Sequence, residues 1–386
     1  MRAAPDLQHT VNWVVKASKL CNLRCRYCYE WNELASPARV SLSQWERLLT
    51  SIRWYHDYRS RASTRRVKTD IIWHGGEPLL LPPDYIAAVM RLQRDLLGEE
   101  LASGDIENTV QTNLYRISDD QLDLLEREGI SIGVSMDVLG GVRVDGRGAE
   151  TEERVAENMD RLAVRGISFG AIAVLAAHTK DRLLDVYRFY EGLRVPVRVL
   201  PLFDAPLNVP GASFRITESE IVAALQTLFR HWLTRRRPIP VYPLLDYLGV
   251  ALHRRRGESD QEYNRDSHGE WAILVNTDGT VYEVMDAYDE ARSLGNVFTQ
   301  PLKDILRSAA YRESLARERE LRARVCGVCT FRGPCNTLPL FEARRESWTG
   351  ERCAIAHDMH TFVDAHLRER QMSERGLRGF LKRVRA

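Results

Sequence analysis

The sequence has no apolar run long enough to cross a membrane and no segment built like a signal peptide. Its longest apolar run, "FGAIAVLAA", is about half of the roughly 18–20 residues that a bilayer requires. The N-terminus lacks the basic start and apolar core of a secretory signal. The 55 Lys and Arg residues nearly balance the 53 Asp and Glu residues, so the charge indicates no nucleic-acid partner. We therefore expect a cytoplasmic protein that binds neither membranes nor nucleic acid.

Cysteine is absent between Cys28 and Cys326, and the total of seven is odd. An odd number fits a disulfide framework poorly, and cytosolic thiols stay reduced. The cysteines fall into two groups, three within 21–28 and four within 326–353. We therefore expect both groups to bind metal or to be catalytic, and not to form disulfides.

Residues 10–205 alternate short apolar runs with amphipathic helical patterns. The expected strands cover 11–18, 69–74, 106–112, 130–136, 168–176 and 196–203. The expected helices cover 42–57, 83–98, 117–128, 150–165 and 181–193. This alternation predicts an α/β fold whose parallel strands are joined by right-handed crossovers. In such sheets, ligands bind at the carboxyl ends of the strands.

The pattern changes after residue 210. The segments expected there are helices over 217–235, 242–254 and 354–371, and a β-hairpin over 271–285. The turn of the hairpin is marked by Asp278-Gly279.

The stretch "KLCNLRCRYCYEW", residues 19–31, follows the first expected strand. It places Cys21, Cys25 and Cys28 together without a fourth cysteine nearby. A structural zinc site closes its tetrahedron with four ligands, whereas a [4Fe–4S] cluster held by three thiolates keeps one iron open. Three reduced structural cysteines, or half of a split zinc site, remain the alternatives.

The motif "CNLRCRYC", with Tyr27 before its last cysteine, resembles the cluster-binding loop of the radical S-adenosylmethionine (SAM) superfamily. The resemblance implies a partial (β/α)6 TIM-like barrel in which Cys21, Cys25 and Cys28 hold a [4Fe–4S] cluster. It also implies that SAM chelates the open iron. Reductive cleavage of SAM would then give a 5′-deoxyadenosyl radical that abstracts hydrogen from the substrate.

The stretch "WHGGEPLL" comes at the end of the second expected strand. Two glycines there let the backbone approach a ligand closely, and a carboxylate can pair with an ammonium group. The stretch resembles the GGEP motif of the family, which implies that Gly75, Gly76, Glu77 and Pro78 hold the amino group of SAM.

Polar residues follow the third and fourth expected strands. The resemblance makes Gln111 and Asn113 polar contacts to SAM, with strand-end capping as the alternative role. It places Ser135 and Asp137 beside the ribose and makes Arg143 a candidate for the SAM carboxylate.

The second cysteine group has the spacing C-x2-C-x5-C, at Cys326, Cys329 and Cys335, followed by Cys353. Four cysteines make a closed site, and the spacing alone fits structural zinc and a [4Fe–4S] cluster equally well. The segment resembles the SPASM extension of radical SAM enzymes, which implies an auxiliary [4Fe–4S] cluster.

The chain departs from a full SPASM domain, which has three more cysteines for an inner auxiliary cluster. Val284 and Pro339 stand where two of these are expected, and the link before the hairpin offers only His268. We therefore expect two [4Fe–4S] clusters, one that binds SAM and one auxiliary. Candidates for a catalytic base are Asp286, after the hairpin, and Asp204, after the sixth strand.

SPASM-type enzymes mostly modify ribosomal peptides. We therefore expect a radical SAM oxidoreductase that abstracts a side-chain hydrogen from a precursor peptide and forms an intramolecular, cyclophane-type cross-link. The alternatives are a dehydrogenase or epimerase that acts on a small molecule or a single peptide residue, and a zinc-stabilised scaffold without redox chemistry. Expected partners are the precursor peptide and a flavodoxin- or ferredoxin-type electron donor. A separate peptide-recognition protein is another expected partner, because the first strand begins about ten residues into the chain and leaves no room before it for a recognition domain.

The expected organisation is a radical SAM barrel over 1–215, a helical linker over 216–265, a SPASM-like domain over 266–372 and a basic tail over 373–386. The tail carries five basic residues and one acidic residue. We expect it to be a frayed, solvated end, with a segment that binds an acidic partner as the alternative.

Overall fold

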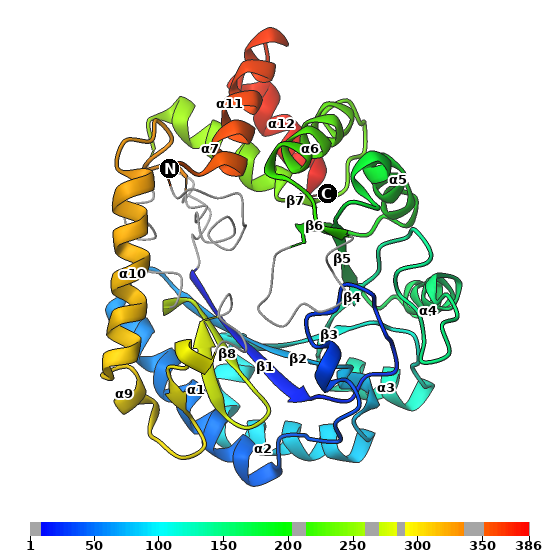
Figure 1. The fold of residues 1–386 in the computed structure, drawn as a ribbon, viewed down its shortest axis with the longest axis vertical. Helices are drawn as coiled ribbons and strands as arrows, with labels where there is room; N and C mark the ends of the chain where they lie inside the picture. The colour runs from blue at the N-terminus through cyan, green and yellow to red at the C-terminus, as the bar shows by residue number, and fades with distance from the viewer. Residues whose placement is uncertain (1–8, 203–213, 259–269, 284–289, 336–350, 386) are drawn as a thin grey trace.

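The computed structural model describes residues 9–202, 214–258, 270–283, 290–335 and 351–385. Within these ranges the chain folds around one curled ten-stranded sheet with the order β10-β9-β8-β1-β2-β3-β4-β5-β6-β7 (Figure 1). The strands are β1 (His9–Ser18), β2 (Val67–Gly75), β3 (Ile106–Thr112), β4 (Ser131–Ser135), β5 (Phe169–Leu175), β6 (Val197–Pro201), β7 (Val241–Tyr242), β8 (Ala272–Val275), β9 (Thr280–Glu283) and β10 (Gly295–Asn296). Neighbouring strands from β8 through β1 to β7 are parallel, while β8, β9 and β10 pair antiparallel.

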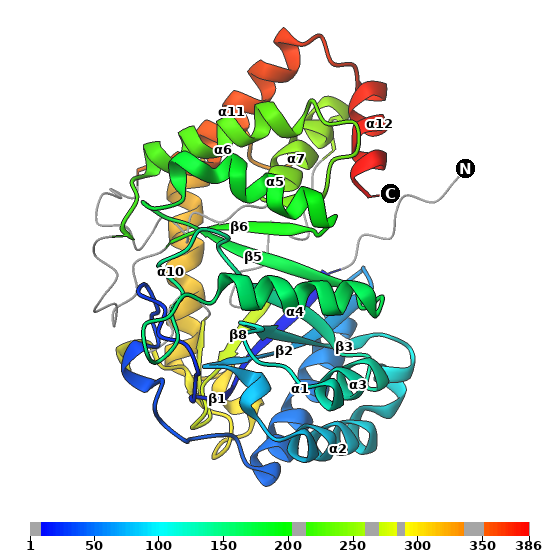
Figure 2. The same ribbon diagram turned by 90° about the vertical axis from the view of Figure 1, so that its right-hand side faces the viewer.

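Helices surround the sheet on its outer side (Figure 1). They are α1 (Leu42–Ala62), α2 (Pro83–Ala102), α3 (Asp119–Arg127), α4 (Glu152–Val164), α5 (Leu183–Leu193), α6 (Glu218–Trp232), α7 (Leu244–Arg256), α9 (Leu302–Ile305), α10 (Ala309–Cys326), α11 (Ala354–Glu369) and α12 (Glu374–Val384). The helices α6, α7, α11 and α12 gather at one end of the molecule (Figure 2). The six expected parallel strands and the α/β barrel class are thus confirmed.

The alternation of side chains along each barrel strand explains why polar residues face the interior of the curled sheet. Trp13 and Trp73 are buried on the outer face, where their rings contact Tyr55 and Trp45 of α1, with ring centroids 5.9 Å and 4.7 Å apart. Because successive side chains of a strand point to opposite faces, the intervening residues face the interior. These inner residues include Lys16, His74, Gln111 and Ser135.

The hairpin that begins the expected SPASM-like domain extends the barrel sheet. Its first strand, β8, pairs parallel with β1, so that Asn12 lies opposite Ala272 and Val15 opposite Val275. The Thr277 hydroxyl donates a hydrogen bond of 2.7 Å to the carbonyl of Lys16. Sequence periodicity could not show this pairing, because it joins segments about 260 residues apart.

The end of the chain differs from the expectation. Residues 374–384 form α12, in which Leu377, Phe380 and Val384 are buried on one face. The ring of Phe380 packs edge-on against Trp232 of α6, with ring centroids 4.8 Å apart. The expected frayed end is therefore wrong for these residues, because three apolar side chains at helical spacing dock the basic segment onto the barrel. Among the described helices, none has the length and apolarity needed to cross a membrane.

Candidate functional site

The three-cysteine loop is fastened to the turn that follows β2. The Gly76 N–H donates to the Ser18 carbonyl at 2.9 Å, and the Glu77 N–H donates to the Leu20 carbonyl at 2.8 Å. A Cβ atom on Gly75, whose φ is +127°, would lie 1.9 Å from the Ser18 oxygen, and one on Gly76 would lie 2.3 Å from the Leu20 oxygen. Only glycine fits at these two positions, because the backbone of one segment packs directly on the backbone of the other. This packing brings the cysteine motif and the GGEP motif together at the carboxyl ends of β1 and β2.

The Glu77 carboxylate joins this turn to the end of β3. It accepts hydrogen bonds from the Leu79 N–H at 2.9 Å, the Thr112 hydroxyl at 2.7 Å and the Asn113 N–H at 2.7 Å. Pro78 begins the short 3₁₀ helix η2 (Pro78–Leu80) beside it. Burial raises the pKa of Glu77 to about 7. Since a carboxylate offers about four acceptor positions, Glu77 retains room for one further donor, such as an ammonium group.

Asn113 connects the end of β3 to the cysteine loop. Its Nδ2 donates to Asn22 Oδ1 at 2.8 Å and lies 3.7 Å from Cys21 Sγ. Gln111 turns instead to the neighbouring strand, where its Nε2 donates to the Ser135 hydroxyl at 2.7 Å. The structure therefore places Gln111 and Ser135 side by side on the inner face and Asn113 against the cysteines.

Asp137, at the end of β4, is a fully buried hub. Its carboxylate accepts hydrogen bonds from the Val174 N–H at 2.9 Å, from Arg143 Nε at 3.2 Å and from the hydroxyl of Tyr27. The Arg143 guanidinium also lies over the Tyr27 ring, 5.5 Å from its centroid, and its Nη1 is 3.9 Å from Cys25 Sγ. Asp137 and Arg143 thus pair with each other and also contact the cysteine loop. The contacts to SAM that we expect from both residues stay predictions.

Burial opposes ionisation of the three thiols, while nearby hydrogen-bond donors favour their thiolate forms. Burial raises the pKa values of Cys21 and Cys28 to about 12, and it also raises the pKa of Cys25. Opposing this, each sulfur is approached by a donor: the Leu23 N–H at 3.4 Å for Cys21, Arg143 for Cys25, and a backbone N–H for Cys28. Hydrogen bonds to sulfur stabilise a cluster and tune its potential. The donor set therefore fits a cluster held by three cysteines.

Sequence reasoning missed a charged cluster on the inner side of this site. Lys16 of β1 is fully buried, and its Nζ lies 2.5 Å from Glu30 Oε1, 3.3 Å from His74 Nδ1 and in contact with the Tyr29 hydroxyl. Burial, reinforced by the Lys16 charge, lowers the pKa of His74 to about 3. The sequence does contain a signal for this cluster. A lysine stands in the apolar strand "VNWVVKAS", at a position that the alternation of side chains assigns to the barrel interior.

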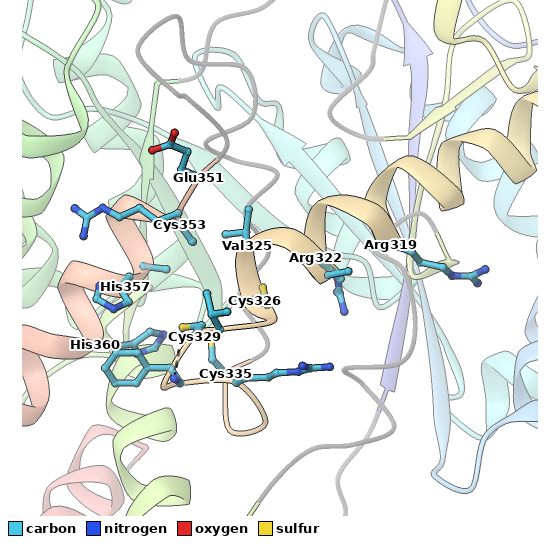
Figure 3. Close-up of a pocket in the computed structure, with 16 residues that line it drawn as sticks. Arg319, Arg322, Val325, Cys326, Cys329, Cys335, Glu351, Cys353, His357 and His360 are labelled. Atoms are coloured by element: carbon cyan, nitrogen blue, oxygen red, sulfur yellow. Dashed lines mark hydrogen bonds between the residues drawn. The ribbon is translucent and has the colours of Figure 1, made fainter.

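The four cysteines of the second group line one cavity of about 340 Å³. Cys326 is the last residue of α10, Cys353 is the N-cap of α11, and Cys329 and Cys335 come from the loop after α10 (Figure 3). The cavity lining also includes arginines. The structure therefore brings all four expected ligands to one site.

Five residues to which the sequence assigns a possible role lie outside the residues that the structure describes. They are the candidate bases Asp204 and Asp286, and the positions Val284, Pro339 and His268 that bear on the missing inner cluster. Their roles stay predictions.

The comparisons with known families agree with this geometry. Residues 15–190 match the model of the radical SAM superfamily, and residues 268–330 match SPASM, an iron–sulfur cluster-binding domain. The chain therefore carries a radical SAM domain and a SPASM-type domain, as expected. Both domains imply [4Fe–4S] clusters, and the first implies SAM binding.

Two curated enzymes are similar to this chain in sequence. The chain is 21% identical over 358 residues to a serine-type anaerobic sulfatase-maturating enzyme of Bacteroides thetaiotaomicron, covering 86% of this chain and 83% of that enzyme. A serine-type enzyme of Klebsiella aerogenes is 30% identical over 177 residues, or 43% of this chain and 42% of that enzyme.

Two of the similar solved structures cover most of this chain. The structure of native anSMEcpe with bound AdoMet and Cp18Cys peptide is 19% identical, with a TM-score of 0.71 over 94% of this chain and 97% of that one. Streptococcus suis SuiB bound to S-adenosylmethionine is 14% identical, with a TM-score of 0.60 over 89% of this chain and 76% of that one. These structural likenesses establish the fold.

Proposed function

We propose that this protein is a radical SAM enzyme that abstracts a side-chain hydrogen from a peptide. The proposal rests on one observation: the three-cysteine loop is fastened by backbone hydrogen bonds to the turn that carries Gly76 and Glu77. This contact sets a three-thiolate site beside a buried carboxylate that can accept from an ammonium group. The names of the relatives and of the solved structures support a peptide as the substrate.

Two [4Fe–4S] clusters form part of the proposal. Cys21, Cys25 and Cys28 would hold the first, and the four cysteines around the second cavity would hold an auxiliary one. When bound, the first cluster would supply the electron for the reductive cleavage of SAM to methionine and a 5′-deoxyadenosyl radical. A flavodoxin- or ferredoxin-type protein would deliver that electron.

The residues of this chain would bind and orient SAM and the substrate. Glu77 would accept from the amino group of SAM, while Asn113 holds the loop of Cys21 in place. Gln111 and Ser135, hydrogen-bonded side by side on the inner face of the barrel, would offer polar groups to bound SAM. Asp204 and Asp286 remain the proposed proton acceptors.

We propose an intramolecular cross-link of cyclophane type in a ribosomal precursor peptide as the product. A second candidate is dehydrogenation of one peptide residue; the names of the relatives, serine-type and cysteine-type maturating enzymes, support chemistry at a single residue. A separate peptide-recognition protein would present the precursor if the barrel alone binds it weakly.

Co-expression with a short peptide encoded beside the gene, followed by mass spectrometry, tests the proposal. Loss of two hydrogens with fragmentation blocked between two residues would identify a cross-link. Loss of two hydrogens confined to one residue would identify dehydrogenation. An unmodified peptide, despite active SAM cleavage, would contradict a peptide substrate and favour a small molecule.

A further inference from the structure

Helix α11 presents one face to the cavity of the four cysteines. Cys353, His357 and His360 all line the cavity, and their spacing of four and three residues puts them on the same side of the helix. Figure 3 shows His360, Cys329 and Cys335 among the residues that line the cavity. A histidine therefore reaches the same space as the four proposed ligands of the auxiliary cluster.

His360 is buried among aromatic rings, with 3% of its surface exposed. Its ring lies 5.0 Å from Tyr247 in an edge-on arrangement and 5.0 Å from Phe331, measured between centroids. Neither of its ring nitrogens has a hydrogen-bond partner among the described residues. Burial, helped by the charge of Arg254, lowers the pKa of His360 to about 4. The imidazole is therefore neutral, with one N–H donor and one acceptor nitrogen.

A buried N–H without an acceptor is rare in folded proteins, so the cavity is expected to supply one. The described polar lining is mostly made of donors, namely Arg319, Arg322, Arg332 and Arg352. The carboxylate of Glu351 also lines the cavity, but it makes no hydrogen bond to His360. A cluster held by the four cysteines would place thiolate and sulfide sulfurs, which are acceptors, in this space.

We propose that the neutral His360 imidazole donates an N–H···S hydrogen bond to the auxiliary cluster and so positions and tunes it. The inference rests on the proposed auxiliary cluster and adds a residue that the cysteine motif does not identify. Hydrogen bonds to cluster sulfurs, like nearby positive charge, favour the reduced state. His360 therefore raises the reduction potential of the auxiliary cluster.

The experiment uses a full-length background in which Cys21, Cys25 and Cys28 are replaced by Ala, so that the auxiliary cluster is the only iron centre. After anaerobic reconstitution, its potential is measured by a redox titration followed by electron paramagnetic resonance. His360→Phe keeps the aromatic packing and removes the donor, so the potential is expected to become more negative. His360→Gln keeps an N–H donor and is expected to recover part of the shift.

His366→Phe is the matched control, because His366 lies on the same helix and stacks on Phe362 instead of lining the cavity. It is expected to leave the potential unchanged. A second readout is pulsed measurements on the reduced background with isotopically labelled histidine. They should show a weakly coupled histidine nitrogen and an exchangeable proton, and His360→Phe should remove both, which separates His360 from His357 in the same cavity.

Four results would overturn the proposal. An unchanged potential in His360→Phe, or the absence of any histidine coupling, would show that His360 only packs. A strong nitrogen coupling would show a direct iron ligand instead of a hydrogen-bond donor. A background without iron would remove the auxiliary cluster itself, while SAM cleavage by the wild-type protein would still support the proposed function.

Discussion

Replacement of Asp137 by Asn is expected to destabilise the protein by about 3–5 kcal/mol, because it breaks a buried ion pair from one side. Asp137 is fully buried, and its Oδ2 lies 3.2 Å from Arg143 Nε. Although burial opposes the charged form of Arg143, the Asp137 carboxylate raises the pKa of that guanidinium well above its usual value. In the variant the guanidinium keeps its charge but has an amide beside it. The Tyr27 hydroxyl loses the same charged acceptor.

Denaturant unfolding of the metal-free protein under anaerobic conditions measures this cost, and iron content after reconstitution measures its effect on the site. Because Tyr27 lies within the cysteine loop, the variant is expected to retain less of the first cluster. Glu157→Gln is the control: its ion pair with Arg154 has an N···O distance of 2.8 Å, and both side chains are more than half exposed. Such pairs are worth about 0–1 kcal/mol. If Asp137→Asn costs no more than this control, the buried pair does not anchor the loop.

Four further substitutions test the packing of the fold and the ionisation of Glu77. Gly75→Ala would put a Cβ atom 1.9 Å from a backbone oxygen at a φ of +127°, so unfolding measurements should show a loss of about 2–5 kcal/mol. Gly192→Ala, in α5 with open space around it, should instead gain about 0.5–1 kcal/mol. Burial raises the pKa of Glu77 from 4.5 to about 7, so the folded metal-free protein holds a proton that the unfolded chain releases. Stability therefore falls as pH rises from about 4.5 to 7, and Glu77→Gln should flatten this fall by an amount of order 3 kcal/mol. Phe380→Ala removes the ring that packs on Trp232 and should cost about 3–5 kcal/mol in the same assay.

Each of these expectations has a contrary result. A Gly75→Ala variant as stable as Gly192→Ala would mean that the turn does not pack on the cysteine loop. Identical pH profiles for the wild type and Glu77→Gln would mean that Glu77 is ionised at neutral pH. An unchanged unfolding midpoint in Phe380→Ala would mean that α12 does not dock on α6.

The barrel could be predicted from the sequence because its signals are local. Strand alternation, such as that around Trp13 and Trp73, and the helical spacing between strands determine the order of the elements. The cysteine and GGEP motifs could be placed together because each follows a strand, and parallel strands end at the same edge. The tail was misread because its five basic residues indicated a solvated end, although Leu377, Phe380 and Val384 stand at helical spacing.

The interactions inside the site could not be read in the same way, because they join distant segments. Asp137 and Tyr27 are 110 residues apart, and their contact leaves no periodic trace. Helix α10 was not predicted from the sequence. Its buried positions, one of which is Glu318, form only a narrow stripe in a highly charged segment. The donors around the cysteines likewise depend on tertiary structure.

Reductive cleavage of SAM by the reconstituted protein is the decisive test of radical SAM chemistry in this protein. Anaerobically purified protein is reduced, mixed with SAM, and assayed for 5′-deoxyadenosine by chromatography, with Cys25→Ala as the control. The three-thiolate site predicts the nucleoside from the wild type and none from Cys25→Ala. Wild-type protein that holds its iron but releases no 5′-deoxyadenosine would contradict the account.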